Sequence, residues 1–184
     1  MQWSRCLGVA AVFAVSVGLS ADAQGALSGS TDSHVSFLAA GPAGMKIEGT
    51  TNDLTLAEQG DNVVITVPLA NLTTGIALRD RHMKEKYLEI AKYPSATMSV
   101  ARSALKIPAG ADKVEADAPS TVTIHGQTKP VTVHYESKRD GSSFSTRGRF
   151  HININEFGIA VPSYLGVTVK PDVDVTASFR ANGS

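Results

Sequence analysis

Short runs in which apolar and polar residues alternate recur along most of the chain. In the first run, Val35, Phe37 and Ala39 share one face, and His34, Ser36 and Leu38 share the other. Successive side chains of a strand point to opposite faces, so this period of two is typical of strands with one buried face. Such runs occupy residues 33–39, 45–49, 63–69, 96–101, 121–125, 131–135, 144–154 and 167–179. About eight strands can close into a barrel whose interior holds either packed side chains or one small ligand.

The alternation stops between Leu72 and Pro94. In this stretch His82, Met83 and Tyr87 fall on one helical face, and the charged residues around them point more to water. Asp80 can serve as an N-cap or first-turn carboxylate, and the residue before Pro94 is biased towards an extended conformation. We therefore predict an all-β, antiparallel barrel of about eight strands, with one short helical insert over about residues 77–91.

The N-terminal residues have the order of a secretory signal. Arg5 precedes an apolar run from Leu7 to Leu19, and Ala21-Asp22-Ala23 follows it. The run is too short to span a bilayer, which needs about 20 apolar residues. We predict a cleaved signal over residues 1–23, a single domain over residues 24–184, a periplasmic or secreted location and no membrane span.

Charge and reactive side chains argue against several functions. Lys and Arg together number 17, as do Asp and Glu, so no basic excess favours nucleic-acid binding. The only cysteine, Cys6, lies in the predicted signal, and the five histidines are scattered singly without metal-ligand spacing. No serine lies in a nucleophile motif. We therefore predict no metal site, no cofactor, no catalytic residue and no enzymatic activity.

Two motifs in the insert carry a family resemblance. The stretch T-G-I-A-L-R-D-R-H-M, residues 74–83, and the stretch Y-L-E-I-A-K-Y-P, residues 87–94, resemble the central signature of the YceI-like family. Residues 36–37, 47–49, 123–131 and 156–159 resemble its other landmarks in the same order. Members of that family are lipocalin-like proteins that bind polyisoprenoids and other long-chain lipids. The resemblance implies a lipocalin-like barrel that holds such a chain.

The interior of the barrel presents two alternatives. Periodicity alone favours a filled core, whereas the resemblance favours a cavity with a long apolar ligand. The predicted apolar lining is Phe37, Ile47, Ile76, Met98, Val100, Ile124, Phe150 and Phe157. On the insert, Arg79, His82 and Tyr87 are candidates for the polar head of the ligand, and Met83 and Leu88 complete the predicted site. A solvated arginine, a histidine bonded to the backbone and a tyrosine packed as a lid are equally compatible readings of those three.

The function predicted from the sequence is non-covalent binding, transport or storage of a lipid. The expected ligand is a long-chain isoprenoid, a prenyl-quinone or a fatty-acid-like molecule. One alternative is an enzyme acting on a lipid or quinone at the barrel mouth, and another is a protein-interaction module with a filled barrel. The sequence leaves the oligomeric state open, a homodimer included.

Overall fold

The computed structural model describes residues 27–110, 112–164 and 167–183. The predicted signal, residues 1–23, lies outside the described residues. Within the described ranges, no helix has both the length and the apolar character that crossing a bilayer requires.

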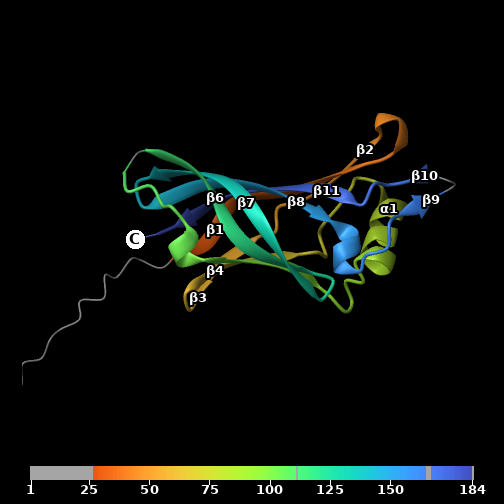
Figure 1. Cartoon of the computed structure of the whole chain (residues 1–184), viewed down its shortest axis with the longest axis horizontal. Helices are drawn as coiled ribbons and strands as arrows, with labels where there is room; N and C mark the ends of the chain where they lie inside the picture. The colour runs from red at the N-terminus through yellow and green to blue at the C-terminus, as the bar shows by residue number, and fades with distance from the viewer. Residues whose placement is uncertain (1–26, 111, 165–166, 184) are drawn as a thin grey trace, which may run out of the picture.

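Most of the described chain is β-structure, and the strands form one large sheet and one small hairpin (Figure 1). The strands are β1 (Ser28–Ala40), β2 (Lys46–Thr51), β3 (Thr55–Gln59), β4 (Asn62–Pro68), β5 (Ser95–Ala101), β6 (Lys113–Ile124), β7 (Gln127–Asp140), β8 (Ser143–Asn153), β9 (Ser163–Tyr164), β10 (Val167–Thr168) and β11 (Asp172–Asn182). Nine of them form an antiparallel sheet in the order β11-β8-β7-β6-β5-β4-β3-β1-β2, and β9 pairs with β10.

The large sheet curls round because β1 also pairs with β11. The C-terminal part of β1 pairs with β2, from Val35 to Ala40, and its first residue, Ser28, pairs with Ala57 of β3. This barrel-like curl confirms the predicted antiparallel barrel. It contains β3, which lies outside the predicted strand runs, and a β6 that begins at Lys113 instead of near Thr121. The predicted last strand is interrupted from Val169 to Pro171, between β10 and β11.

The predicted helical insert is present as α1 (Ala77–His82), which continues directly into the π-helical turn η2 (Met83–Tyr87). It ends before the predicted residue 91, because Leu88 caps it and Glu89 has a φ of +45°. The excursion leaves and rejoins the sheet at one place, where the Leu69 N–H donates to the Pro94 carbonyl oxygen at 2.9 Å. It is also tied to β2 by a bridge between Thr50 and Thr73. Short 3-10 turns are η1 (Pro42–Gly44), η3 (Arg102–Ala104) and η4 (Ile154–Phe157).

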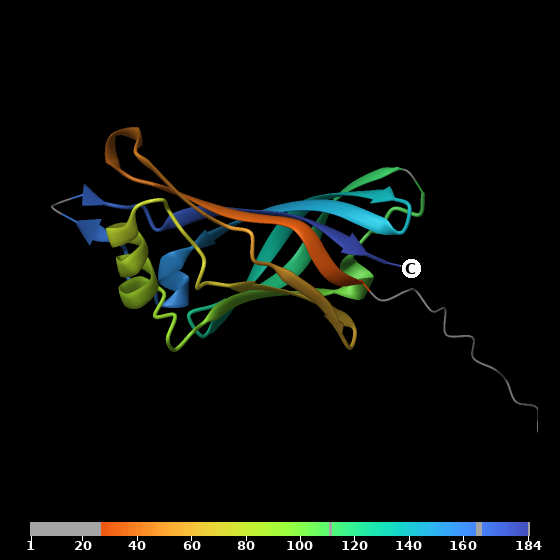
Figure 2. The ribbon, with the colours of Figure 1, turned by 180° about the vertical axis from the view of Figure 1, so that it is seen from behind.

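The two ends of the barrel differ. Both views place α1, η4, the β9–β10 hairpin and the turn between β1 and β2 at one end (Figures 1 and 2). The start of β1 and the end of β11 meet at the other, where Ser28 pairs with Asn182. We refer to these as the α1 end and the termini end.

Candidate functional site

A cavity of about 880 Å³ runs through the barrel. Protein interiors normally contain few voids larger than a water molecule, and ligand pockets span roughly 300–1,000 Å³. The barrel is therefore hollow, and the alternative of a filled barrel does not describe this structure.

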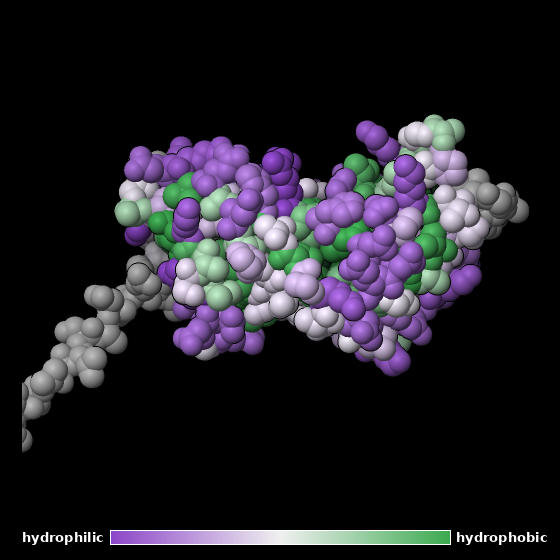
Figure 3. All heavy atoms as spheres, in the orientation of Figure 1, coloured by the Kyte–Doolittle hydropathy of each residue, from purple (hydrophilic) through white to green (hydrophobic). Residues whose placement is uncertain are grey.

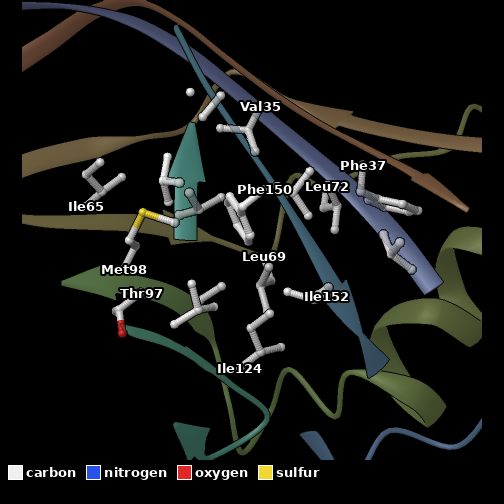
Figure 4. A pocket seen from close by; sticks show the side chains of 18 of the residues that line it. Val35, Phe37, Ile65, Leu69, Leu72, Thr97, Met98, Ile124, Phe150 and Ile152 are labelled. Atoms are coloured by element: carbon white, nitrogen blue, oxygen red, sulfur yellow. The ribbon is translucent and has the colours of Figure 1, made fainter. Parts of the chain in front are cut away.

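The wall of the cavity is built by the inward faces of the strands. Val35, Phe37 and Ala39 of β1 all line it, as the period of two requires. Figure 4 shows apolar side chains from several strands directed into the same space, among them Ile65, Met98 and Phe150. The strand-borne wall is consequently almost wholly apolar.

Small residues keep the interior open. Ala39, Ala96, Gly148 and Ala177 line the cavity. Ala177 of β11 and Gly148 of β8 are directly paired neighbours in its wall. A large side chain at any of these positions would occupy space that is empty in the structure. Inward-facing residues on neighbouring strands can fill a core. Here they leave room, because several of them have small side chains or none.

Several polar side chains in the wall have hydrogen-bond partners within the protein. A hydrogen bond of 3.0 Å joins the hydroxyls of Ser137 and Thr146. The buried hydroxyl of Tyr135 accepts from the Lys106 N–H at 2.7 Å and donates to the Lys106 carbonyl oxygen at 3.1 Å. These groups therefore do not require polar atoms from a ligand in the depth of the cavity.

The cavity opens at the α1 end. At the termini end, the apolar lining residues Leu27, Phe144 and Ala181 are 7%, 6% and 3% exposed. At the α1 end, the lining residues Met45, Ile76 and Leu78 are 46%, 53% and 48% exposed. An extended ligand can therefore reach the interior past α1, and we call this opening the mouth.

A small hydrogen-bond network fixes the start of α1 at the mouth. Arg79 donates from Nε to Thr74 Oγ1 at 2.7 Å and from a terminal nitrogen to the Thr74 carbonyl oxygen at 2.8 Å. Asp80 accepts from the hydroxyls of Thr73 and Thr74 and from the Thr74 N–H. Burial acts to raise the pKa of Asp80, but these hydrogen bonds and the charge of Lys84 outweigh it and lower that pKa. Arg79 and Thr74, which both line the cavity, are held in place by this network.

The lysine and arginine side chains that line the cavity are not matched by any lining carboxylate in the described part of the chain. Arg79, Lys86 and Lys170 lie at the α1 end together with His82, and Lys106 lies towards the termini end. Among the described lining residues there is no aspartate or glutamate. The mouth therefore favours neutral or anionic groups over cationic ones.

Most of the predicted site residues converge on this cavity. Those that line it are Phe37, Ile47, Ile76, Arg79, His82, Met83, Tyr87, Leu88, Met98, Val100, Ile124 and Phe150. Phe157 instead lies in a packed hydrophobic cluster with Ile152 and Ile159 and is 1% exposed, so it supports the wall without being part of the lining.

Sequence reasoning missed several lining residues. Val35 and Phe179 lie on strand faces that the alternation already marks, so the alternation could have identified them as lining residues. Leu69 continues the alternation of Ile65 and Val67, so the same pattern could have identified it as well. Leu72 follows in a segment without alternation, and its direction into the cavity becomes visible only in the fold (Figure 4).

A histidine joins the end of the insert to two other segments. The Nε2 of His125, in the β6–β7 turn, lies 2.5 Å from Glu89 Oε2, and its Nδ1 donates to the Phe157 carbonyl oxygen at 3.2 Å. Tyr93 packs on the His125 ring with a centroid distance of 4.6 Å. We call His125, Glu89 and Tyr93 the insert latch, because together they fasten the chain after η2 to the barrel.

Two further histidines lie on the outer face of the sheet. His134 contacts Asp117 and Glu115 of β6 at 2.7 and 2.9 Å, and His151 contacts Asp174 and Asp172 of β11 at 2.9 and 3.4 Å. The hydrogen bonds to Asp117 and Asp174 are the main causes that raise the pKa of His134 and of His151. Neither group has the arrangement of a metal site, and no such cluster occurs elsewhere in the described part of the chain.

Comparisons with known proteins agree with this architecture. The model of the YceI-like domain matches residues 28–181. A UPF0312 protein from Pseudomonas syringae pv. tomato is 28% identical over 136 residues, which cover 70% of this chain and 67% of the relative.

Two solved structures share the fold. A polyisoprenoid binding domain from Saccharophagus degradans, implicated in plant cell wall breakdown, superimposes with a TM-score of 0.71 and 14% identity, covering 88% of this chain and 99% of that domain. A YceI protein from Campylobacter jejuni gives a TM-score of 0.57 and 17% identity, with 75% of this chain and 85% of that protein covered. At these identities the two structures show likeness of fold alone.

Proposed function

The chain belongs to the YceI-like domain family, and on that basis we propose that it binds one long-chain isoprenoid, or a lipid of similar shape, non-covalently in its barrel. The observation that carries the proposal is the cavity of about 880 Å³, whose strand-borne wall is apolar and whose described lining contains no carboxylate. We propose further that the protein acts as a carrier or store in the periplasm or outside the cell, in keeping with the predicted signal.

The size of the hydrophobic contribution is sufficient for this role. Each methylene moved from water into an apolar site contributes about 0.8 kcal/mol, so a chain of about 20 carbons contributes about 16 kcal/mol. Association and ordering oppose binding by roughly 4–15 kcal/mol. The balance favours long chains over short ones, because the opposing terms grow little with each added carbon. Met83 and Met98, which are unbranched and adaptable, would let the wall fit chains of different shape.

The polar end of the ligand would lie at the mouth. Arg79 and His82 line the cavity there, and the guanidinium of Arg79 is held by Thr74. A hydroxyl, carbonyl or acidic head could accept hydrogen bonds from these side chains while the chain extends towards the termini end. This orientation leaves the hydroxyls of Ser137 and Thr146 bonded to each other.

Native mass spectrometry of the protein purified from its own host tests the proposal. We expect an added mass of several hundred daltons in stoichiometric amount, released on denaturation as a prenyl lipid or related molecule. A bare protein mass that stays unchanged after incubation with prenyl lipids would refute the binding proposal and favour a role in protein interaction.

A pair of variants separates binding in the cavity from binding to the outer surface. Ala177→Phe places a ring in the cavity between Val35 and Gly148, and we expect it to abolish the added mass. Thr176→Phe is the matched control, because Thr176 pairs with Ser36 and Arg149 and does not line the cavity. Equal retention of lipid by both variants would contradict the proposed site.

The same experiment addresses enzymatic activity. A carrier returns the lipid chemically unchanged after prolonged incubation, whereas an enzyme at the mouth would yield a product of different mass. Chromatography and mass spectrometry of the extracted lipid distinguish the two outcomes.

A further inference from the structure

The three large apolar residues with the greatest exposure in the described chain gather at the mouth. Met45 belongs to the turn between β1 and β2, and Ile76 and Leu78 flank the start of α1; all three line the cavity. Figure 3 shows apolar side chains at the surface near the α1 end, among polar residues of the face in view. Large apolar side chains exposed around an opening are typical of a surface that meets another apolar phase.

The segments that carry these residues are positively charged. Residues 41–47 and 76–92 contain six lysines or arginines and three carboxylates, although the whole chain has 17 of each sign. Two of the three carboxylates are engaged within the protein, Asp80 with Thr73 and Thr74, and Glu89 with His125. Lys170, which also lines the cavity, adds a further positive charge at the same end.

The turn that carries Met45 is held in a fixed shape. The Gly41 N–H donates to the Met45 carbonyl oxygen at 2.7 Å, and the Met45 N–H donates to the Pro42 carbonyl oxygen at 3.0 Å. On the other side of the mouth, the Thr73, Thr74 and Asp80 hydrogen bonds fix the start of α1. The exposed apolar residues are therefore presented by ordered backbone on both sides of the opening.

Apolar side chains surrounded by cations match the interface of an anionic bilayer. The apolar groups fit the boundary between head groups and acyl chains, and lysine and arginine pair with lipid phosphates. We propose that the α1 end docks on an anionic lipid bilayer, with Met45, Ile76 and Leu78 inserted at head-group level and the mouth facing the lipid. The purpose of this docking rests on the proposed function. It lets an insoluble ligand pass between the bilayer and the cavity without crossing water.

A single tryptophan reports insertion directly. Trp3 is the only tryptophan of the chain and lies in the predicted signal. Leu78→Trp in the processed protein, or in a Trp3→Phe chain where the signal is retained, therefore carries one fluorophore at the mouth. We expect its emission to shift to shorter wavelength, and to be quenched by lipid-borne quenchers, with vesicles of phosphatidylglycerol and phosphatidylcholine in equal parts. Ser142→Trp is the matched control and should not respond, because Ser142 lies in the exposed turn between β7 and β8 and its carbonyl oxygen accepts from the Gly183 N–H at the termini end. An unchanged spectrum for Leu78→Trp, or an equal response from both, would overturn the proposal.

Charge variants test the cationic part with residues that do not line the cavity. The triple variant Lys46→Gln, Arg81→Gln, Lys84→Gln should lower the partition coefficient on those vesicles by about 100-fold, since each cation near an anionic surface contributes about fivefold. The matched control Lys113→Gln, Lys138→Gln, Arg147→Gln removes the same charge from the outer face of β6, β7 and β8 and should have an effect below about twofold. Equal losses from both triples would show that net charge, and not the mouth, governs binding.

Two further measurements separate docking from ligand binding and from self-association. The Lys46, Arg81 and Lys84 triple should bind a prenyl-quinone in detergent micelles as the unmodified protein does. If no prenyl lipid binds but vesicle insertion persists, the docking stands and the proposed function fails. If a prenyl lipid binds but the vesicles do not, the docking alone is refuted.

Sedimentation velocity in the absence of vesicles should give a monomer. A dimer that Leu78→Ser dissociates would assign the apolar residues to a second copy of the chain and overturn the proposal.

Discussion

The ring of Phe37 covers Gly49 so closely that a Cβ built on Gly49 would lie 2.2 Å from Phe37 Cε1. The two residues pair directly across β1 and β2, and Phe37 lines the cavity. The absence of a side chain at Gly49 thus determines where this aromatic part of the wall lies.

Gly49→Ala should move the Phe37 ring towards the cavity. The far end of the ring is free to turn into the empty interior, so we expect a loss of stability of about 1–3 kcal/mol and a weaker affinity for a prenyl probe. Denaturant unfolding and fluorescence titration measure the two effects. In a Phe37→Ala background the same substitution should have little effect on stability, and an undiminished effect there would contradict the coupling.

Tyr135→Phe should destabilise the barrel by about 1–3 kcal/mol, because the buried hydroxyl bonds both the N–H and the carbonyl oxygen of Lys106. Urea unfolding followed by circular dichroism measures the change. Tyr87→Phe is the comparison, since no hydrogen bond of the Tyr87 hydroxyl is recorded in the described part of the chain. A loss as large for Tyr87→Phe would show that the Lys106 bonds are not responsible.

Breaking the insert latch should loosen the segment after η2. His125→Ala removes the contacts with Glu89 Oε2 and with the Phe157 carbonyl oxygen. We expect faster amide exchange for residues 84–93, measured by hydrogen–deuterium exchange, with β8 and β11 unaffected. His34→Ala, which removes an exposed contact with Asn52, is the control and should leave residues 84–93 protected. Uniformly faster exchange in the latch variant would indicate global destabilisation instead.

The outer histidines should titrate above their ordinary range. Carboxylates raise the pKa of His134 and of His151 above the reference of about 6.5. A raised pKa in the folded state gives stability that is complete below the unfolded pKa and is lost as pH rises through the folded one. Asp174→Asn should therefore lower the pKa of His151, followed by NMR, and destabilise the protein more at about pH 5.5 than at about pH 8. An unchanged pKa of His151 in this variant would refute Asp174 as the cause of the raised pKa. His134, which pairs with other carboxylates, is the internal control.

The period of two was sufficient to predict the antiparallel barrel and much of the cavity wall. Residues such as Phe37, Met98 and Phe150 lie on faces that alternation marks, and the structure brings them together around one space. Their role as ligand contacts stays a prediction. The YceI-like motifs in the insert and elsewhere along the chain were also sufficient to identify the family.

The elements that were missed have weak or non-local signals. β3 offers only Leu56 as a buried apolar residue, and the first half of β6 alternates small residues such as Ala116 and Ala118 with charged ones. Both strands are stabilised by pairing with neighbours, which a single sequence does not reveal. The hollow interior likewise depends on how Ala177 and Gly148 meet across strands, because neither residue alone predicts a void.

If the proposed ligand enters past α1, the buried apolar residues at the termini end would limit the length of the tail that the barrel can hold. A chain that enters past α1 can advance only until it reaches Leu27, Phe144 and Ala181, which are buried at the far end. The distance between these stops and the mouth therefore sets the longest tail that can be held with its head outside. Larger or smaller side chains at the termini end should then change the longest tail that is bound, without altering the residues of the mouth.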